Sequence, residues 1–560
     1  MRFNLGAKKH ISPDRSRLAE KRKRLPVRAT ATLLAGVLAT STLSGCSAAD
    51  LPFWPTHMLQ TSEGASESGA DDSFTTLGLT PDLDYEKPVI EAHIEIDQMG
   101  YLPESRKLAI FRGEELGETF SVVSVDSREV VYTGDIKSKT EARGGETFYY
   151  GDFTDLTVEG TYYIQTDVIG YSYPFSIKKD LYDGVLETAL KQYYLNRCGM
   201  SLTEKYAAEG ARSACHTDPV TLQQDAEVSL DVTGGWHTGQ SGDRDVIQGC
   251  NTIEALLLAY EYNSAAFDDG VDIPESGDGI PDILNELKVE TDWLLKMQDP
   301  STGAVYEGII STDQGKGLEN PCHILGIDMD STLAFASALG YFSYLYQTVD
   351  TAYATVCLQA ADRAMKYAAK FIDTVDQDKY FRAATMLYRA TGYYTYRMIV
   401  ENYCTGRTEY NMSDNVVFTG VVTYLATKQK TNSAICSVMM NDLRSYAEDM
   451  SDARKDTLFL MGEKSKTVEN STLLSEIARL SVVNYIISSN EYVNIMERYL
   501  HYFMGCNPYN ICYVGQYGSV NISDTEAGRD ILRQPEQDAY FIVLLAGVSA
   551  GSEVNATSSD

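Results

Sequence analysis

Hydrophobic and polar residues follow two different patterns along this chain, and the change comes at about residue 180. Between His93 and about Lys178, short apolar runs are separated by turns rich in Gly, Asp and Glu, a pattern that predicts short strands. This spacing is typical of a small β-sandwich. The clearest runs are 109–111, 120–125, 130–132, 161–165 and 173–177.

In the rest of the chain, apolar residues recur with the period of an amphipathic helix. In the segment 280–297, Ile283, Leu287 and Leu294 share one face, and Pro281 stands in a first helical turn, which tolerates proline. Many long helices after one small sheet fit a solenoid or a closed double ring of helices, and the lack of a fixed-period repeat disfavours the solenoid. The predicted helices are 246–262, 280–297, 331–347, 352–372, 381–404, 475–488, 492–504 and 537–550.

The first 91 residues do not have the pattern of a folded domain. A basic stretch leads into the apolar run 31–38, which is too short to span a membrane, and Leu43-Ser-Gly-Cys46 follows. Residues 1–45 are therefore predicted to be a signal peptide. Because Leu-Ser-Gly-Cys resembles the bacterial lipobox, Cys46 is predicted to be the lipidated first residue of the mature protein. The alternative is an ordinary signal peptide with an incidental cysteine.

Residues 46–91 are rich in Ser, Gly, Asp, Thr and Pro, and they offer too few apolar groups to form a core. We expect them to be a disordered linker between the anchor and the folded part. The protein is then expected to be extracellular and held at the bacterial cell membrane as a lipoprotein.

Length and charge narrow the class of protein. A chain of 560 residues exceeds what one core usually supports, so two folded domains are expected. The net charge of −32 would repel nucleic acid phosphates, and the densest basic run lies at the extreme N-terminus. Nucleic acid is therefore excluded as a partner, whereas a neutral polysaccharide would not be repelled.

Two cysteines and two histidines, Cys198, Cys215, His216 and His237, fall within about forty residues. Two thiolates and two imidazoles suit tetrahedral zinc. The alternative is a set of buried cysteines and hydrogen-bonded histidines. Seven further cysteines lie mostly in or beside apolar helical patterns and are predicted to be free thiols: Cys250, Cys322, Cys357, Cys404, Cys436, Cys506 and Cys512.

Several short motifs occur in order between residues 92 and 550. They are Ile94-Glu-Ile-Asp-Gln-Met-Gly-Tyr-Leu-Pro103, Asn196-Arg-Cys-Gly199, Ala214-Cys-His-Thr-Asp218, Gly234-Gly-Trp-His237, Ile273-Pro-Glu-Ser-Gly-Asp-Gly-Ile-Pro-Asp-Ile-Leu284, Trp293-Leu-Leu-Lys-Met-Gln298 and Gly505-Cys-Asn-Pro508. With these motifs the chain resembles family 9 glycoside hydrolases that carry an N-terminal immunoglobulin-like domain and act on cellulose and related β-glucans.

The resemblance implies a mainly α protein. A small immunoglobulin-like β-sandwich is expected at 92–178 and an (α/α)6 barrel at 179–555, with the sugar cleft at one end of the barrel. Members of this type carry a Cys, Cys-His, His set at places that match Cys198, Cys215, His216 and His237. The resemblance thus implies a structural zinc site, with all four positions filled by protein.

The catalytic motifs are where this chain departs from the family. Inverting hydrolysis needs a carboxylic acid and a carboxylate base, and the family carries its base in Asp-Ala-Gly-Asp directly after Gly-Gly-Trp-His. Here the aligned residues are Thr238-Gly-Gln-Ser241, which offer no carboxylate. Asp243 and Asp245 follow and are the candidate replacements; the alternative is that they are solvated loop residues.

The family's acid corresponds to Glu536, which also fits a first helical turn without any catalysis, because the helix dipole favours a carboxylate there. The family's histidine-bearing segment after Asn507-Pro508 is absent, which indicates a shortened substrate loop. Trp236, beside the loop, is the candidate sugar-stacking residue, with a core role as the alternative.

A group of acidic residues could supply oxygen ligands to calcium, but it lacks an EF-hand pattern, so a solvated acidic loop is the default interpretation. The group is Asp268, Asp269, Asp272, Glu275, Asp278 and Asp282.

Two functions remain open from the sequence. In one, the chain is a surface-anchored β-glucan hydrolase with a relocated base, and in the other it is an inactive relative that binds glycans or a partner. Two carboxylates facing each other at about 6.5–9.5 Å would favour the hydrolase.

Overall fold

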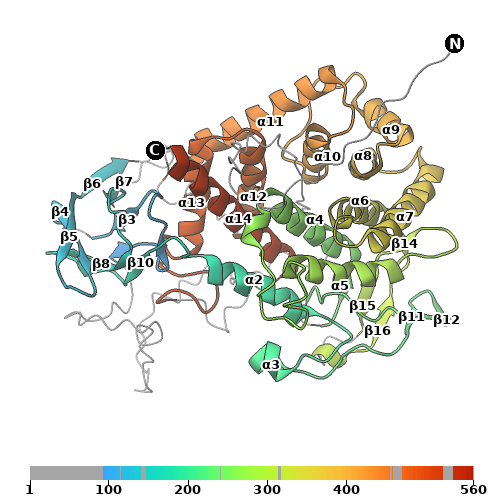
Figure 1. Ribbon diagram of the computed structural model, residues 1–560, viewed down its shortest axis with the longest axis horizontal. Helices are drawn as coiled ribbons and strands as arrows, with labels where there is room; N and C mark the ends of the chain where they lie inside the picture. Colours follow the sequence, from blue (N-terminus) through green and yellow to red (C-terminus); the bar gives the residue numbers. More distant parts are fainter. Residues whose placement is uncertain are drawn as a thin grey trace, which may run out of the picture.

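The structure is a computed structural model that describes residues 93–558, except 114, 141–146, 240, 313–316, 455–456, 458–469, 521–531 and 533. Figure 1 shows a β-sandwich beside a larger helical domain. The predicted signal peptide, Cys46 and the linker lie outside the described residues. Among the described helices, none combines the length and the apolar character needed to cross a membrane.

The sandwich consists of two sheets around a core of aromatic and branched side chains, among them Phe120, Phe153 and Ile164. Inward residues alternate with outward ones along its longer strands, as expected for a sheet with one buried face. The first sheet has the order β1 (Ile94–Glu95), β3 (Leu108–Phe111), β7 (Thr147–Asp152), β6 (Lys137–Thr140). The second has the order β2 (Gly100–Tyr101), β10 (Phe175–Ile177), β8 (Gly160–Thr166), β4 (Thr119–Ser124), β5 (Val130–Asp135), with β9 (Gly170–Tyr171) on β8.

The helical domain is an (α/α)6 barrel, in which inner and outer helices alternate along the chain. The inner helices are α4 (Val246–Tyr262), α6 (Met329–Tyr346), α8 (Gln377–Thr391), α10 (Asn415–Ala426), α12 (Asn470–Ile486) and α14 (Pro535–Ser558). The outer helices are α2 (Asp183–Asn196), α5 (Asp282–Lys296), α7 (Thr351–Ala368), α9 (Tyr394–Cys404), α11 (Ser433–Arg454) and α13 (Asn490–Phe503). A short helix, α3 (Glu204–Ala207), follows α2.

The inner helices form a closed ring. Each of the pairs α4–α6, α6–α8, α8–α10, α12–α14 and α14–α4 packs side by side. Between α10 and α12, the Arg479 guanidinium donates to the Ser413 carbonyl at 2.7 Å and to Asn415 Oδ1 at 2.8 Å. The barrel core lies inside this ring, where α6 alone buries most of its eighteen residues.

The inner helices begin at one end of the barrel, which we call the barrel mouth. Lys379 in the first turn of α8 pairs with Asp330 in the first turn of α6, whereas Arg389 pairs with Glu261 near the other ends of α8 and α4. Aspartates accept hydrogen bonds from first-turn N–H groups and cap α4, α6, α8 and α10 at the mouth: Asp245, Asp328, Asp376 and Asp414.

One predicted helix is in fact two. The segment 381–404 was expected as a single helix, but α8 ends where Gly392 takes a left-handed conformation with φ 68°, and α9 begins at Tyr394. A glycine in this conformation is a common helix terminator. The break turns the chain from the inner ring to the outer ring.

Two small sheets lie on the mouth side of the barrel. One has the order β12 (Asp225–Leu230), β11 (Val220–Leu222), β16 (Cys322–Ile324), β15 (Gly308–Ser311), β13 (Arg244–Asp245), and the other pairs β14 (Val305–Tyr306) with β17 (Ile327–Asp328). These strands fix the segment 231–245, which we call the base loop, against the barrel.

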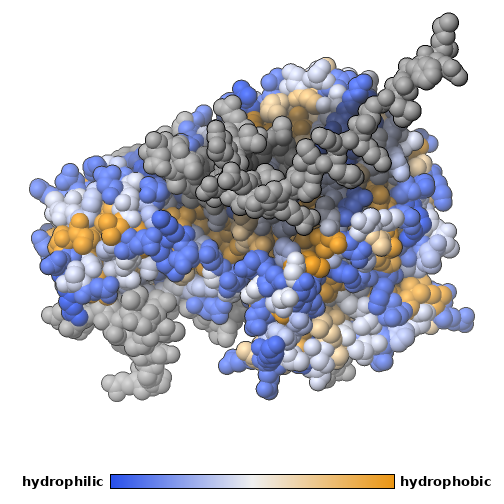
Figure 2. Space-filling model, in the orientation of Figure 1, coloured by the Kyte–Doolittle hydropathy of each residue, from blue (hydrophilic) through white to orange (hydrophobic). Residues whose placement is uncertain are grey.

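The sandwich is attached to the barrel by a buried polar junction. Gln98 donates from Nε2 to the Asn510 carbonyl at 2.7 Å and accepts at Oε1 from Ser519 N and Val520 N, both at 2.8 Å. Asp97 Oδ2 lies 2.8 Å from His501 Nδ1. Elsewhere, Figure 2 shows a mostly hydrophilic face with small apolar patches, one of them on the sandwich.

Candidate functional site

The four predicted metal ligands come together beside the base loop, which contributes His237. Their ligand atoms all lie within 4.8 Å of one another. Cys215 Sγ is 3.9 Å from Cys198 Sγ and 3.5 Å from His237 Nε2, and Cys198 Sγ is 3.6 Å from His216 Nδ1. A tetrahedral zinc with two thiolates and two imidazoles has ligand-to-ligand edges of about 3.3–3.8 Å. The donor set and its spacing therefore fit a structural zinc ion.

Backbone hydrogen bonds hold the ligand-bearing segments together. Cys198 N donates to the Gly235 carbonyl at 2.7 Å, and His237 N donates to the Asn196 carbonyl at 2.9 Å. The Arg212 guanidinium lies 3.3 Å from Cys215 Sγ. The pKa of the Cys215 thiol is lowered, first by hydrogen bonding with Cys198 and then by the two imidazoles. A thiolate, the form that binds metal, is thus available at this position.

Trp236 is not a sugar-stacking residue, and that prediction is wrong. Its side chain is only 1% exposed. The indole ring packs on Tyr193 with centroids 4.8 Å apart, and its Nε1 lies 3.4 Å from Glu286 Oε2. A buried face cannot stack on a glycan, so the alternative core role applies.

Asp243 is engaged within the base loop and the neighbouring strand. Its Oδ1 accepts from Ser311 N of β15 at 2.6 Å, and its Oδ2 accepts from the Ser241 hydroxyl at 2.9 Å. Its carbonyl accepts from Thr238 N at 2.8 Å. Both carboxylate oxygens thus stabilise the conformation of the loop.

Asp245 lies at the barrel mouth, where it caps α4 through Oδ1, 2.8 Å from Gln248 N. Burial is the main cause that raises its pKa above the usual range, and the nearby Asp328 carboxylate adds to the effect. Glu307 has a raised pKa for the same two reasons, burial first and Asp328 second. Three carboxylates on adjoining elements therefore act on one another here.

Glu536 is half-buried in the first turn of α14. The Tyr540 hydroxyl donates to its Oε1 at 2.6 Å, and the Tyr193 hydroxyl donates to the Pro535 carbonyl at 2.7 Å. Because Tyr193 also packs on Trp236, it connects the start of α14 to the base loop.

The predicted calcium group is used for other contacts. Asp269 accepts from Gly277 N and Gly279 N, both at 2.6 Å, while Glu275 binds Arg197 through two bonds of 2.9 Å. Asp282 accepts from Val271 N at 2.7 Å. Within the described residues, the cluster whose ligand atoms converge as at a metal site is the Cys/His set.

Sequence reasoning missed Arg244, whose side chain is buried inside the base loop. It is fully buried, and its Nη1 donates to the carbonyls of Val232 at 2.8 Å and Gly234 at 2.9 Å. An arginine between two loop aspartates reads as a surface residue, so the only signal was its place in a segment already of interest. Asp328 and Glu307 were missed because only tertiary structure brings them near Asp245, which pairs with Gly308 next to Glu307, while Asp328 pairs with Val305 of β14.

Comparison with known proteins decides the family. The family model for Glycosyl hydrolase family 9 matches residues 182–526, more than half of the chain, and the model for the Cellulase N-terminal ig-like domain matches residues 90–170. This chain belongs to glycosyl hydrolase family 9. Its N-terminal immunoglobulin-like domain and barrel agree with that membership.

The family 9 chain is similar to several characterised proteins. It is 26% identical over 481 residues to Endoglucanase D of Acetivibrio thermocellus, which covers 80% of this chain and 76% of the relative. It is 28% identical over 463 residues to the Cellodextrinase of Butyrivibrio fibrisolvens, covering 75% and 84%. The crystal structure of a metagenome-derived glycoside hydrolase family 9 endoglucanase has the same fold, with a TM-score of 0.73, 24% identity and coverage of 81% and 98%.

Proposed function

We propose that this protein hydrolyses cellulose or a related β-glucan at the barrel mouth by inversion, with Glu536 as the acid and Asp245 as the base. The observation that carries the proposal is the position of these two carboxylates in the first turn of α14 and at the cap of α4, two inner helices that pack side by side. Similarity to an endoglucanase and a cellodextrinase supports the substrate class.

Inverting hydrolysis uses two carboxyl groups, which inverting enzymes hold about 6.5–9.5 Å apart to leave room for a water molecule. Glu536 would protonate the leaving glycosidic oxygen while Asp245 removes a proton from water on the opposite face of the sugar. A carboxylate whose pKa is raised by burial is a stronger base in this role.

The second candidate function is binding without cleavage. It is favoured because both carboxylate oxygens of Asp243 accept hydrogen bonds within the protein, and because Thr238 and Ser241 offer no carboxylate. If Asp245 serves only as a helix cap, the protein binds a glycan or a partner at the mouth without cleaving it.

Reducing-sugar release from a panel of β-glucans tests these two functions. The wild-type chain is compared with Asp245→Asn, Glu536→Gln and Asp243→Asn, each checked for an unchanged thermal unfolding midpoint. We expect release by the wild type, a loss of at least about 100-fold in kcat for the Asp245 and Glu536 variants, and a smaller loss for Asp243→Asn. Absence of release from every glucan, with glucan binding retained, would establish the binding function instead.

We further propose that the Cys/His cluster holds a structural zinc and that Cys46 is lipidated, which would place the protein outside the cell at the membrane. Zinc supplies a cross-link between the chain segments that lead into the base loop. The lipid anchor is supported by the Leu-Ser-Gly-Cys46 sequence. Incorporation of a labelled fatty acid by the wild type, and its loss in Cys46→Ala, tests the anchor.

A further inference from the structure

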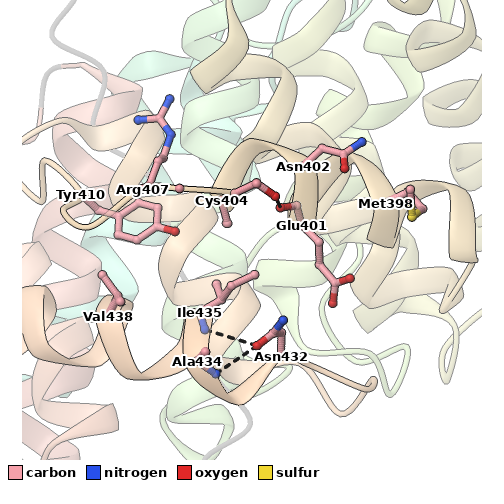
Figure 3. A pocket seen from close by; sticks show the side chains of 12 residues that line it. Met398, Glu401, Asn402, Cys404, Arg407, Tyr410, Asn432, Ala434, Ile435 and Val438 are labelled. Carbon is pink, nitrogen blue, oxygen red and sulfur yellow. Dashed lines mark hydrogen bonds between the residues drawn. The ribbon is translucent and has the colours of Figure 1, made fainter.

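A pocket of about 420 Å³ opens on the outer wall of the barrel, between the C-terminal part of α9, the loop that follows it and the start of α11 (Figure 3). Ligand pockets in proteins range from about 300 to 1,000 Å³. This pocket is therefore large enough for a small ligand. Its lining includes none of the candidate catalytic or metal-binding residues.

The charged groups at the pocket are already compensated. Glu401 Oε1 lies 2.9 Å from Arg397 Nε and 2.8 Å from Arg397 Nη2. The Arg407 guanidinium lies 3.9 Å from the centre of the Tyr403 ring and 3.8 Å from Asp378 Oδ1. Because Glu401 is paired with Arg397, and Arg407 lies on Tyr403 and near Asp378, a neutral ligand would disturb fewer existing interactions than a charged one.

The backbone groups at the two helix ends are also largely satisfied. Asn432 Oδ1 accepts from Ala434 N at 3.0 Å at the start of α11, and the Asn432 carbonyl accepts from Cys436 N at 3.0 Å. At the end of α9, the Asn402 carbonyl accepts from Thr405 N at 3.1 Å. Polar recognition is thus left to side chains, chiefly the amide of the exposed Asn402 and the Nδ2 group of Asn432.

Apolar side chains complete the pocket. Met398, Ile435 and Val438 contribute aliphatic surface, and Met398 is 37% exposed. Figure 3 shows Tyr410, Ile435 and Asn432 among the residues that line the pocket, and the Tyr410 side chain is only 4% exposed. The lining therefore combines amide donors and acceptors with aliphatic surface.

We propose that this pocket is a second glycan site, separate from the barrel mouth, which binds a neutral mono- or disaccharide. A pyranose presents hydroxyl groups around its edge and C–H groups on its faces, and this combination matches uncharged amides beside aliphatic walls. The site does not depend on the hydrolysis proposed above. It would hold a glycan end on the protein whether or not the mouth cleaves the chain.

The experiment follows the methyl signal of Met398 in the full chain labelled with 13C-methyl methionine, titrated with cellobiose and with glucose. The signal is assigned from the spectrum of Met398→Leu. We expect a saturable shift in the wild type and in Glu536→Gln, because that variant alters only the mouth. In Asn432→Asp, which keeps the helix cap but exchanges the Nδ2 donor for a charged acceptor, we expect the Kd to rise about tenfold or more.

Ile435→Trp, which fills the pocket, is expected to abolish the shift, and the other methionine signals report whether the variant is folded. No saturable shift of the Met398 methyl with either sugar would overturn the proposal. So would an unchanged Kd in Asn432→Asp, since the polar contact would then carry no binding energy. Retained glucan hydrolysis in both pocket variants would leave the mouth proposal intact and show that the two sites are separate.

Discussion

At the scale of single residues, the Cys/His cluster and the base loop are packed directly against each other. His216 has a left-handed φ of 49°, and its ring lies against Gly242 of the base loop. Gly242 itself has a φ of 85°, and a Cβ there would come within 2.5 Å of His216 Cε1. A residue of any other type at 242 would have to displace the His216 ring.

Gly242→Ala should therefore weaken metal binding. Strain at the positive φ and the clash with the His216 ring both act on the folded, metal-bound state. We expect the purified wild type to contain about one zinc per chain and the variant to lose zinc to a chelator at least about ten times faster. Gly239→Ala is the matched control, because a Cβ at 239 meets nothing within 4 Å. Less than about half an equivalent of zinc in the wild type would refute the site itself.

The sequence predicted which four side chains form the Cys/His cluster because residue types and their order carry that information. Two thiols and two imidazoles rarely come together in a protein except where they can bind a metal. Trp236 carried no such information, since an indole suits a core and a sugar cleft equally well. Only the three-dimensional packing on Tyr193 decides between these roles.

At the scale of elements, α5 packs against the base loop and the adjoining Arg197 segment. Two buried carboxylates of α5, Glu286 and Glu290, make the contacts. Glu286 binds the Arg197 guanidinium with its Oε1 at 2.8 Å and its Oε2 at 3.1 Å, and Glu290 Oε2 accepts from Trp236 N at 2.7 Å. Burial raises the pKa of Glu290 to about 8, against 4.5 for the free group. The helix thus carries a carboxyl group that is protonated near neutral pH.

Glu290 should make the stability of the fold depend on pH. Because the folded state holds this proton up to a higher pH than the unfolded state does, the free energy of unfolding falls as the pH rises from about 4.5 to about 8. Glu290→Gln cannot ionise and retains an oxygen for Trp236 N, so its stability should fall less steeply over this range. Urea unfolding at several pH values measures the two curves, and parallel curves would contradict the assignment.

Helix periodicity predicted α4 at its observed bounds, because its apolar residues recur without interruption. The same signal ran through Gly392 and joined α8 to α9, since a single glycine does not interrupt the apolar period. It also missed α10, which is apolar on almost every face and therefore has little periodicity. The pattern also missed α2 and α11, although each exposes one face to solvent.

At the scale of the whole molecule, sandwich and barrel share a junction built on Gln98, which is 2% exposed. Gly505 and Gly518 leave room for its side chain, because a Cβ at either position would come within 2.9 Å of it. The partners of Gln98 lie more than four hundred residues further along the chain. The two domains are thus joined through a few specific hydrogen bonds.

Gln98→Ala should loosen this junction. Its loss leaves the Asn510 carbonyl and the Ser519 and Val520 N–H groups without their partner, which we expect to lower the free energy of unfolding by about 2 kcal/mol or more. Differential scanning calorimetry should then resolve separate transitions for sandwich and barrel. Gln165→Ala, on the outward face of the central strand β8 of the sandwich, is the control and should keep the wild-type profile. A single unshifted transition in Gln98→Ala would contradict the role of the junction.

The architecture followed from the sequence because motifs spread over the whole chain specify the family. The relative placement of the proposed acid Glu536 and the proposed base Asp245 did not, since they are almost three hundred residues apart and are positioned only by the packing of α4 on α14. Such a separation depends on tertiary structure, which local patterns do not encode.

The junction also has a consequence for the order of events during synthesis. The sandwich leaves the ribosome more than four hundred residues before the segment that receives Gln98. Contacts this distant in sequence close late and slowly. The sandwich must therefore keep its docking surface open until nearly the whole barrel has been delivered, and a chain truncated before residue 510 would expose that surface permanently.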